Sequence, residues 1–210
     1  MLPFSEEQFF DVFARYNEAV WPAPIAAYLI AALALAGAFL KSGVGEKGAL
    51  VCVAMLWAWT GIVYHGLFFA DINPAGPVFA ALFVVQAVIL FYFAARSSFS
   101  FQYTGAAQAT GWAMIAYAAL IYPLLNAWSG HAYPRAPSFG VTPCPLVIFT
   151  FGLLLLTRLR APWALIAVPA LWAVIGGSAA FLLDVIPDLA LPISAVIAIT
   201  LNARKSVKPA

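Results

Sequence analysis

The stretch that decides the fold is residues 77–95, which read PVFAALFVVQAVILFYFAA and include no charged side chain. A helix that crosses the hydrocarbon core of a bilayer needs about 20 mainly apolar residues. This stretch has that length and composition, with Gln86 near its middle as its most polar residue. It therefore predicts a membrane-spanning helix.

The same pattern recurs along the chain. Of its 210 residues, 65% are hydrophobic and 9% are charged, whereas soluble proteins average about half and about a quarter. These figures exclude a soluble enzyme, a nucleic-acid-binding domain, a disordered chain and a secreted disulfide scaffold. The charge-free stretches predict one all-α membrane domain, residues 1–210, with seven transmembrane helices at about 22–40, 49–69, 77–95, 106–126, 143–157, 162–183 and 186–202.

The distribution of charge predicts the orientation, because short loops rich in Lys and Arg stay in the cytoplasm. Seven crossings would place most basic residues on one side: Lys41, Lys47, Arg96, Arg158, Arg160, Arg204, Lys205 and Lys208. The other side would receive most of the acids: Glu6, Glu7, Asp11, Glu18, Asp71, Asp184 and Asp188. We therefore expect the N-terminus outside, the C-terminus in the cytoplasm, the lipid bilayer as a partner and no nucleic acid.

An amphipathic helix is predicted over residues 5–20, before the first span. Ser5 and Gln8 have the spacing of a capping box, and Phe9, Phe13 and Tyr16 recur along one helical stripe. Such a helix typically lies in the membrane interface. It would serve as an anchor and lid for the bundle, or alternatively as a gate over a cavity or a docking surface.

Within the predicted spans no acidic or basic residue lies deep, which argues against proton pumps and voltage sensors. Gln86 is the polar residue best placed to face an internal cavity, although a hydrogen bond between helices is the commoner role. Pro123, Pro169 and Pro192 fall within or near the ends of spans, where each removes a backbone hydrogen bond and favours a kink.

The predicted outer side carries the polar residues that suggest chemistry. They form a candidate binding vestibule, to which Gln86 is added from the membrane interior: His65, Asp71, Asn73, Asn126, His131, Tyr133, Arg135 and Cys144. Cys144 would begin a helix, where the helix dipole favours a thiolate.

A thiolate with imidazole nearby suits a soft or borderline metal ion, so His65, His131 and Cys144 are candidate ligands. The alternative is a small packed cysteine. No hydrolase, zinc-protease or phosphate-loop motif is present, so the sequence argues against an enzyme.

Several motifs resemble a bacterial family of small multi-pass membrane proteins that is catalogued as a domain of unknown function. They include Tyr64-His65, Ile72-Asn73-Pro74-Ala75, His131-Ala132-Tyr133-Pro134, Pro143-Cys144-Pro145 and Gly176-Gly177-Ser178-Ala179-Ala180. The similarity extends over nearly the whole chain. It implies a location in the bacterial cytoplasmic membrane and implies no substrate.

Three hypotheses for function remain. The first is a small carrier or channel for a solute or soft metal, with the vestibule as its outer site. The second is a non-catalytic accessory subunit of a larger membrane complex. For partners, a homo-oligomer is the alternative to such a complex. The third is a membrane thiol enzyme that uses Cys144.

Overall fold

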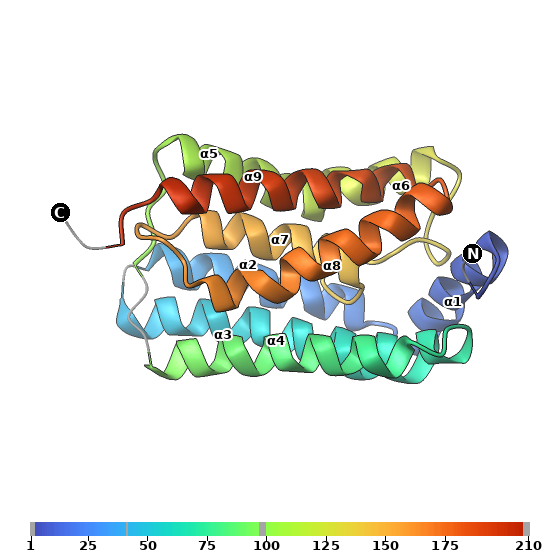
Figure 1. Cartoon of the computed structure of the whole chain (residues 1–210). Coiled ribbons are helices and arrows are strands. Elements are labelled where there is room, and N and C mark those ends of the chain that lie inside the picture. The colour runs from blue at the N-terminus through green and yellow to red at the C-terminus, as the bar shows by residue number, and fades with distance from the viewer. Residues whose placement is uncertain (1–2, 41, 97–99, 208–210) are drawn as a thin grey trace.

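The computed structural model describes residues 3–40, 42–96 and 100–207, so Lys41 and Lys208 lie outside the described residues. Each of the seven expected segments is helical (Figure 1). The elements are α1 (Glu6–Ala19), α2 (Ala23–Phe39), α3 (Gly43–Trp59), η1 (Thr60–Phe68), η2 (Phe69–Asp71), α4 (Gly76–Arg96), α5 (Ala106–Ala116), η3 (Tyr117–Ile121), α6 (Tyr122–Trp128), α7 (Pro143–Leu155), α8 (Trp163–Leu182), η4 (Ile186–Leu189) and α9 (Ala190–Arg204). The described residues form an all-helical bundle.

Five helical segments are long and apolar enough to cross a membrane. These are Gly43–Asp71, Gly76–Arg96, Ala106–Trp128, Trp163–Leu182 and Ile186–Arg204. A sixth is obtained if α1 and α2, which meet at a bend of 82°, are counted together. The remaining segment, α7, is apolar but has only 13 residues.

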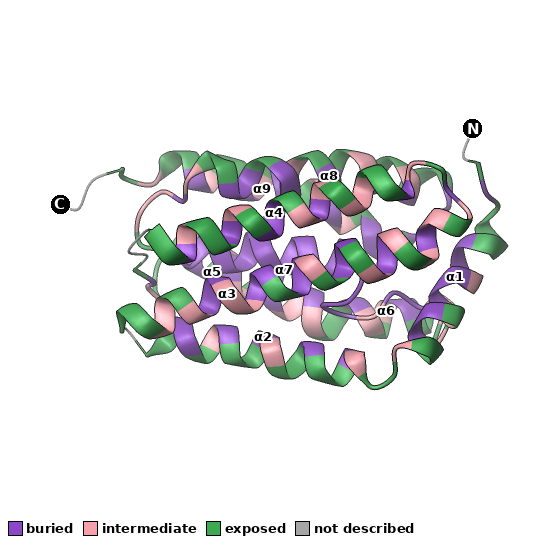
Figure 2. Ribbon diagram, turned by 90° about the horizontal axis from the view of Figure 1, so that it is seen from below, coloured by how far each residue is buried: buried purple, intermediate pink, exposed green. Residues whose placement is uncertain are grey.

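α7 occupies the centre of the bundle. Every residue from Pro143 to Leu155 is buried, and Figure 2 shows this helix enclosed by the others. It packs closely on α5, because a methyl group added at Gly111 or at Gly152 would lie 2.7 Å from the carbonyl oxygen of the other glycine. Glycine is therefore required where these two backbones meet.

Two prolines inside helices leave carbonyl groups that other helices satisfy. Pro169 in α8 has no N–H to donate to the carbonyl of Leu165, four residues earlier. Gln86 of α4 donates its Nε2 to that oxygen at 3.0 Å. Pro123, in the first turn of α6, also has no N–H, and the carbonyl of Ala119 in the preceding turn accepts the hydroxyl of Tyr28 at 2.7 Å. Gln86 therefore bonds between helices, which is the commoner of the two roles considered for it, and it is not among the residues that line the cavity described below.

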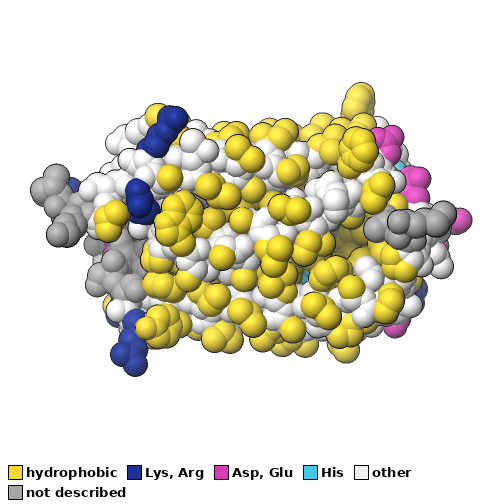
Figure 3. Space-filling model, viewed as in Figure 1, with side chains coloured by type: hydrophobic (Ala, Val, Ile, Leu, Met, Phe, Trp, Pro, Cys, Tyr) yellow, Lys and Arg dark blue, Asp and Glu magenta, His cyan; other side chains and the backbone are white. Residues whose placement is uncertain are grey.

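Charged side chains collect at the two ends of the bundle, with a hydrophobic belt between them (Figure 3). α1 and most acids lie at one end, and the C-terminal end of α9 lies at the other (Figures 1 and 3). At the basic end Lys205 donates its Nζ to the carbonyls of Leu155 (2.8 Å) and Thr157 (2.7 Å). It thus satisfies carbonyls at the C-terminus of α7 that have no partner within the helix. Burial lowers the pKa of Lys205 to about 8.

Candidate functional site

A cavity of about 130 Å³ lies at the acidic end, beneath α1 and between η1, α7 and α8. Seven aromatic side chains line it: Phe4, Phe9, Phe13, Tyr64, Phe69, Phe79 and Trp172. Five polar residues also line it: His65, Asn73, Cys144, Ser178 and Asp188. A concave, largely apolar site with a few convergent polar groups is the usual form of a small-molecule site.

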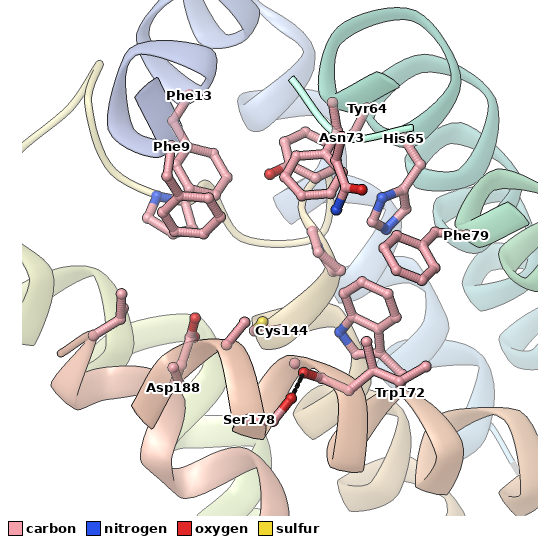
Figure 4. Close-up of a pocket in the computed structure, with 18 of the residues that line it drawn as sticks. Phe9, Phe13, Tyr64, His65, Asn73, Phe79, Cys144, Trp172, Ser178 and Asp188 are labelled. Carbon is pink, nitrogen blue, oxygen red and sulfur yellow. Dashed lines mark hydrogen bonds between the residues drawn. The ribbon is translucent and has the colours of Figure 1, made fainter. Parts of the chain in front are cut away.

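An unusual helix positions two of these residues. Residues Thr60–Phe68 continue α3 as a π-helix of nine residues, in which the N–H of Phe69 reaches the carbonyl of Tyr64. Such segments are rare and occur often at functional sites. Here the π-helix carries Tyr64 and His65 on the cavity wall (Figure 4).

His65 is enclosed by aromatic rings and is 1% exposed. Its ring lies 4.7 Å from that of Phe83 and 4.9 Å from that of Trp172, measured between centroids. Neither Nδ1 nor Nε2 has a hydrogen-bond partner among the described residues. Burying such a group without a partner costs about 1–3 kcal/mol, so this imidazole is an unsatisfied polar group on the cavity wall.

Cys144 and Asp188 form the side of the cavity across from His65 (Figure 4). Asp188 is 3% exposed and accepts a hydrogen bond from the hydroxyl of Tyr122 at 2.5 Å. Cys144 lies next to Asp188. A buried position beside a carboxylate stabilises the neutral thiol, so the thiolate expected from the helix dipole is not favoured. The acidic end of the bundle therefore includes a buried acid, Asp188.

α1 closes the cavity at the acidic end. Phe9 and Phe13 point toward it (Figure 4), and the stripe expected to face the membrane interface is instead buried in the protein. Asn17 fixes this position, because its Nδ2 donates to the carbonyls of Pro134 (2.7 Å) and Ala136 (2.8 Å). The anchor-and-lid interpretation of this segment therefore agrees with the packing.

Three predicted vestibule residues hold α1 in place and do not line the cavity. Asp71 pairs with Arg15 at 3.4 Å, and Arg135 pairs with Asp11 at 2.9 Å. Tyr133 donates its hydroxyl to the carbonyl of α1 residue Asn17 at 3.1 Å. The two ion pairs are about half exposed, so each contributes at most about 1 kcal/mol.

Asn126 and His131 line a separate surface pocket beside Asp184. The ring of His131 stacks on Phe10 at 3.6 Å between centroids. Of the three metal-ligand candidates, only His65 and Cys144 share the cavity. The described part of the chain holds no group of three His, Cys, Asp or Glu side chains placed to bind a metal.

The sequence interpretation identified His65, Asn73 and Cys144 for the cavity and missed Asp188, Tyr122 and the aromatic wall. Asp188 was placed among the acids of the same outer side but was not included among the vestibule residues. The stripe Phe9–Phe13 was the available signal for the aromatic wall, but its partners on η1 and α8 come from distant parts of the chain.

Comparison with known proteins identifies the family. No match was found among curated proteins or among solved structures. The model of one family, described as a family of unknown function (DUF6064), matches residues 6–209, which is nearly the whole chain. The resemblance to a family catalogued as a domain of unknown function is therefore confirmed, and the chain belongs to the DUF6064 family.

Proposed function

We propose that this protein is a membrane-embedded carrier that binds a small organic solute in the cavity beneath α1. The observation that carries the proposal is the aromatic-walled cavity in which the buried His65 lacks a hydrogen-bond partner among the described residues. A ligand that hydrogen-bonds to the imidazole would remove the cost of leaving it unsatisfied.

The size of the cavity limits the ligand. An apolar cavity of about 150 Å³ accommodates benzene in another protein, and this one measures about 130 Å³. The solute that fits is therefore about one ring with a short substituent. Figure 3 shows a hollow with hydrophobic walls where α8 and α4 approach α1, and these elements also line the cavity. We assign the entrance to this hollow.

The charged ends support an orientation for the carrier. Most of the described basic residues lie at one end, and the positive-inside rule assigns that end to the cytoplasm. The cavity and its α1 lid would then face the outside of a bacterial cytoplasmic membrane. A soft-metal cargo has weaker support, because His131 is in a different pocket from His65 and Cys144.

Binding of one-ring probes tests the proposal. The purified full chain in nanodiscs is titrated with benzyl alcohol and with benzylamine, and binding is followed by saturation-transfer NMR. Ala179 of α8 lines the cavity, so Ala179→Phe should fill it and weaken binding of any probe at least tenfold. Ala167→Phe adds the same side chain at an exposed position of α8 and should leave binding unchanged.

Two results would defeat the proposal. One is that neither probe binds the unmodified protein above the level seen with empty nanodiscs. The other is that Ala179→Phe and Ala167→Phe bind both probes equally well. Uptake of the bound probe into proteoliposomes then separates a carrier from a static binding protein.

A further inference from the structure

We infer that the solute is an organic ammonium cation, held between the aromatic wall of the cavity and the buried carboxylate of Asp188. This inference rests on the proposed function and adds the chemical class of the ligand to it.

Asp188 is placed so that its carboxyl group is ionised. Its carboxyl group is 3% exposed and accepts the Tyr122 hydroxyl at 2.5 Å. A hydroxyl group that donates a hydrogen bond to a carboxylate stabilises its ionised form. Tyr122 is itself fully buried, so water does not replace this contact. The geometry thus favours an anionic carboxylate inside the bundle.

The described part of the protein supplies no cation for this carboxylate. Among the described residues that line the cavity, none is Lys or Arg. The ion pairs found in the described ranges, Arg15–Asp71 and Arg135–Asp11, are both at the surface. Buried charges in proteins are normally paired. A bound ligand is therefore the natural source of the positive charge.

The aromatic rings of the cavity wall also suit a cation. Aromatic rings attract cations to their faces, and this is how proteins recognise alkylated ammonium groups. Phe9, Phe13, Tyr64, Phe79 and Trp172 come from four elements and face one space (Figure 4). A metal ion would need more donor groups than the described residues bring together. An ammonium group on a one-ring body uses both the carboxylate and the aromatic faces.

The test compares two probes of nearly equal shape. Benzylamine is protonated at pH 7, whereas benzyl alcohol is neutral, so the ratio of their dissociation constants measures the contribution of charge. We expect benzylamine to bind at least tenfold more tightly to the unmodified full chain in nanodiscs. Asp188→Asn keeps an acceptor for Tyr122 and should abolish this preference while leaving the affinity for benzyl alcohol within about twofold.

Asp184→Asn is the matched control. Asp184 is exposed, lies four residues from Asp188 and has a φ of 52°, a conformation that Asn tolerates. The control removes the same charge from the same end of the protein and should keep the preference for benzylamine. If Asp184→Asn loses the preference as fully as Asp188→Asn does, general surface attraction explains it and the inference is wrong.

The outcomes separate the inference from the proposed function. Equal binding of both probes to the unmodified protein overturns the ammonium inference and retains a cavity for neutral solutes. Absence of binding by either probe overturns the proposed function itself. Both results come from the unmodified protein, so the test remains decisive if Asp188→Asn does not fold.

Discussion

The hydrogen bond from Gln86 to Leu165 gives a sharp test of how this bundle accommodates a proline in the middle of a helix. Leu165 is the residue whose carbonyl would accept the N–H of position 169 in a regular helix, and Pro169 has no N–H. The Nε2 of Gln86 replaces that donor at 3.0 Å. Replacing Gln86 with Leu keeps a buried side chain of similar size and removes the donor.

The expected loss is about 1 kcal/mol. An unsatisfied buried carbonyl costs about 1–3 kcal/mol, while measured hydrogen bonds between membrane helices average about 0.6 kcal/mol and reach about 1.7. The Oε1 of Gln86 has no partner among the described residues. Gln86→Leu removes this unsatisfied oxygen together with the donor, which offsets part of the loss. The expected value of about 1 kcal/mol therefore lies between the average of about 0.6 and the maximum of about 1.7 kcal/mol measured for hydrogen bonds between membrane helices.

The proline determines whether the loss occurs at all. Pro169→Ala restores an N–H that can bond to Leu165, and the donor from Gln86 then becomes redundant. In that background Gln86→Leu removes mainly an unsatisfied oxygen, so it should be neutral or slightly stabilising. The two substitutions should therefore couple by about 1 kcal/mol in a double-mutant cycle.

The four proteins of this cycle are unfolded reversibly in mixed micelles at increasing SDS fraction, with helix content followed by circular dichroism. Each free energy of unfolding is taken from the fitted transition. If Gln86→Leu lowers the free energy of unfolding equally in the unmodified protein and in the Pro169→Ala variant, to within about 0.3 kcal/mol, Gln86 does not compensate for the proline and the reasoning fails.

Three further predictions concern α1, the centre of the bundle and its basic end. Asn17→Leu should lower the free energy of unfolding by about 2–4 kcal/mol and expose α1 to protease, because a buried and a partly buried loop carbonyl lose their donor; unchanged protection would contradict this role. Gly152→Ala should destabilise the protein by about 1–3 kcal/mol through a 2.7 Å clash, whereas Gly48→Ala meets nothing within 4 Å and should stabilise helix α3 slightly. Burial lowers the pKa of Lys205 from 10.5 to about 8, so the folded protein loses this proton first and gains stability as the pH rises from about 8 to 10.5; Lys205→Met should remove that gain from the unfolding free energy measured against pH.

The positions of the helices could be predicted from the sequence because charge and length limit where a lipid-crossing segment can lie. The seven charge-free stretches coincide with helical segments of the structure. Hydropathy does not distinguish a helix that faces lipid from one that is covered by protein, since both are apolar. The complete burial of α7 was therefore not visible in its sequence.

The site could be predicted only in part. His65, Asn73 and Cys144 share the cavity because their segments end on the same side of the bundle. Which of several residues on that side meet depends on how the helices pack, and one sequence gives no pairing information. The same limit applies to Gln86. The sequence of α8 shows that Pro169 leaves the carbonyl of Leu165 without its helical donor, but it does not show that Gln86 of α4 supplies one.

The enclosed helix α7 also has a consequence for how the protein is made. At 1.5 Å per residue, its 13 residues extend for about 20 Å, which is shorter than the roughly 30 Å of hydrocarbon in a bilayer. In the membrane-embedded carrier that we propose, α7 would gain little from entering lipid on its own during synthesis, and its Gly152 backbone contact with α5 requires a neighbour already in place. Insertion of α7 is thus expected to wait for α8, with the two entering as a hairpin, so that assembly of the second half of the chain is one cooperative event.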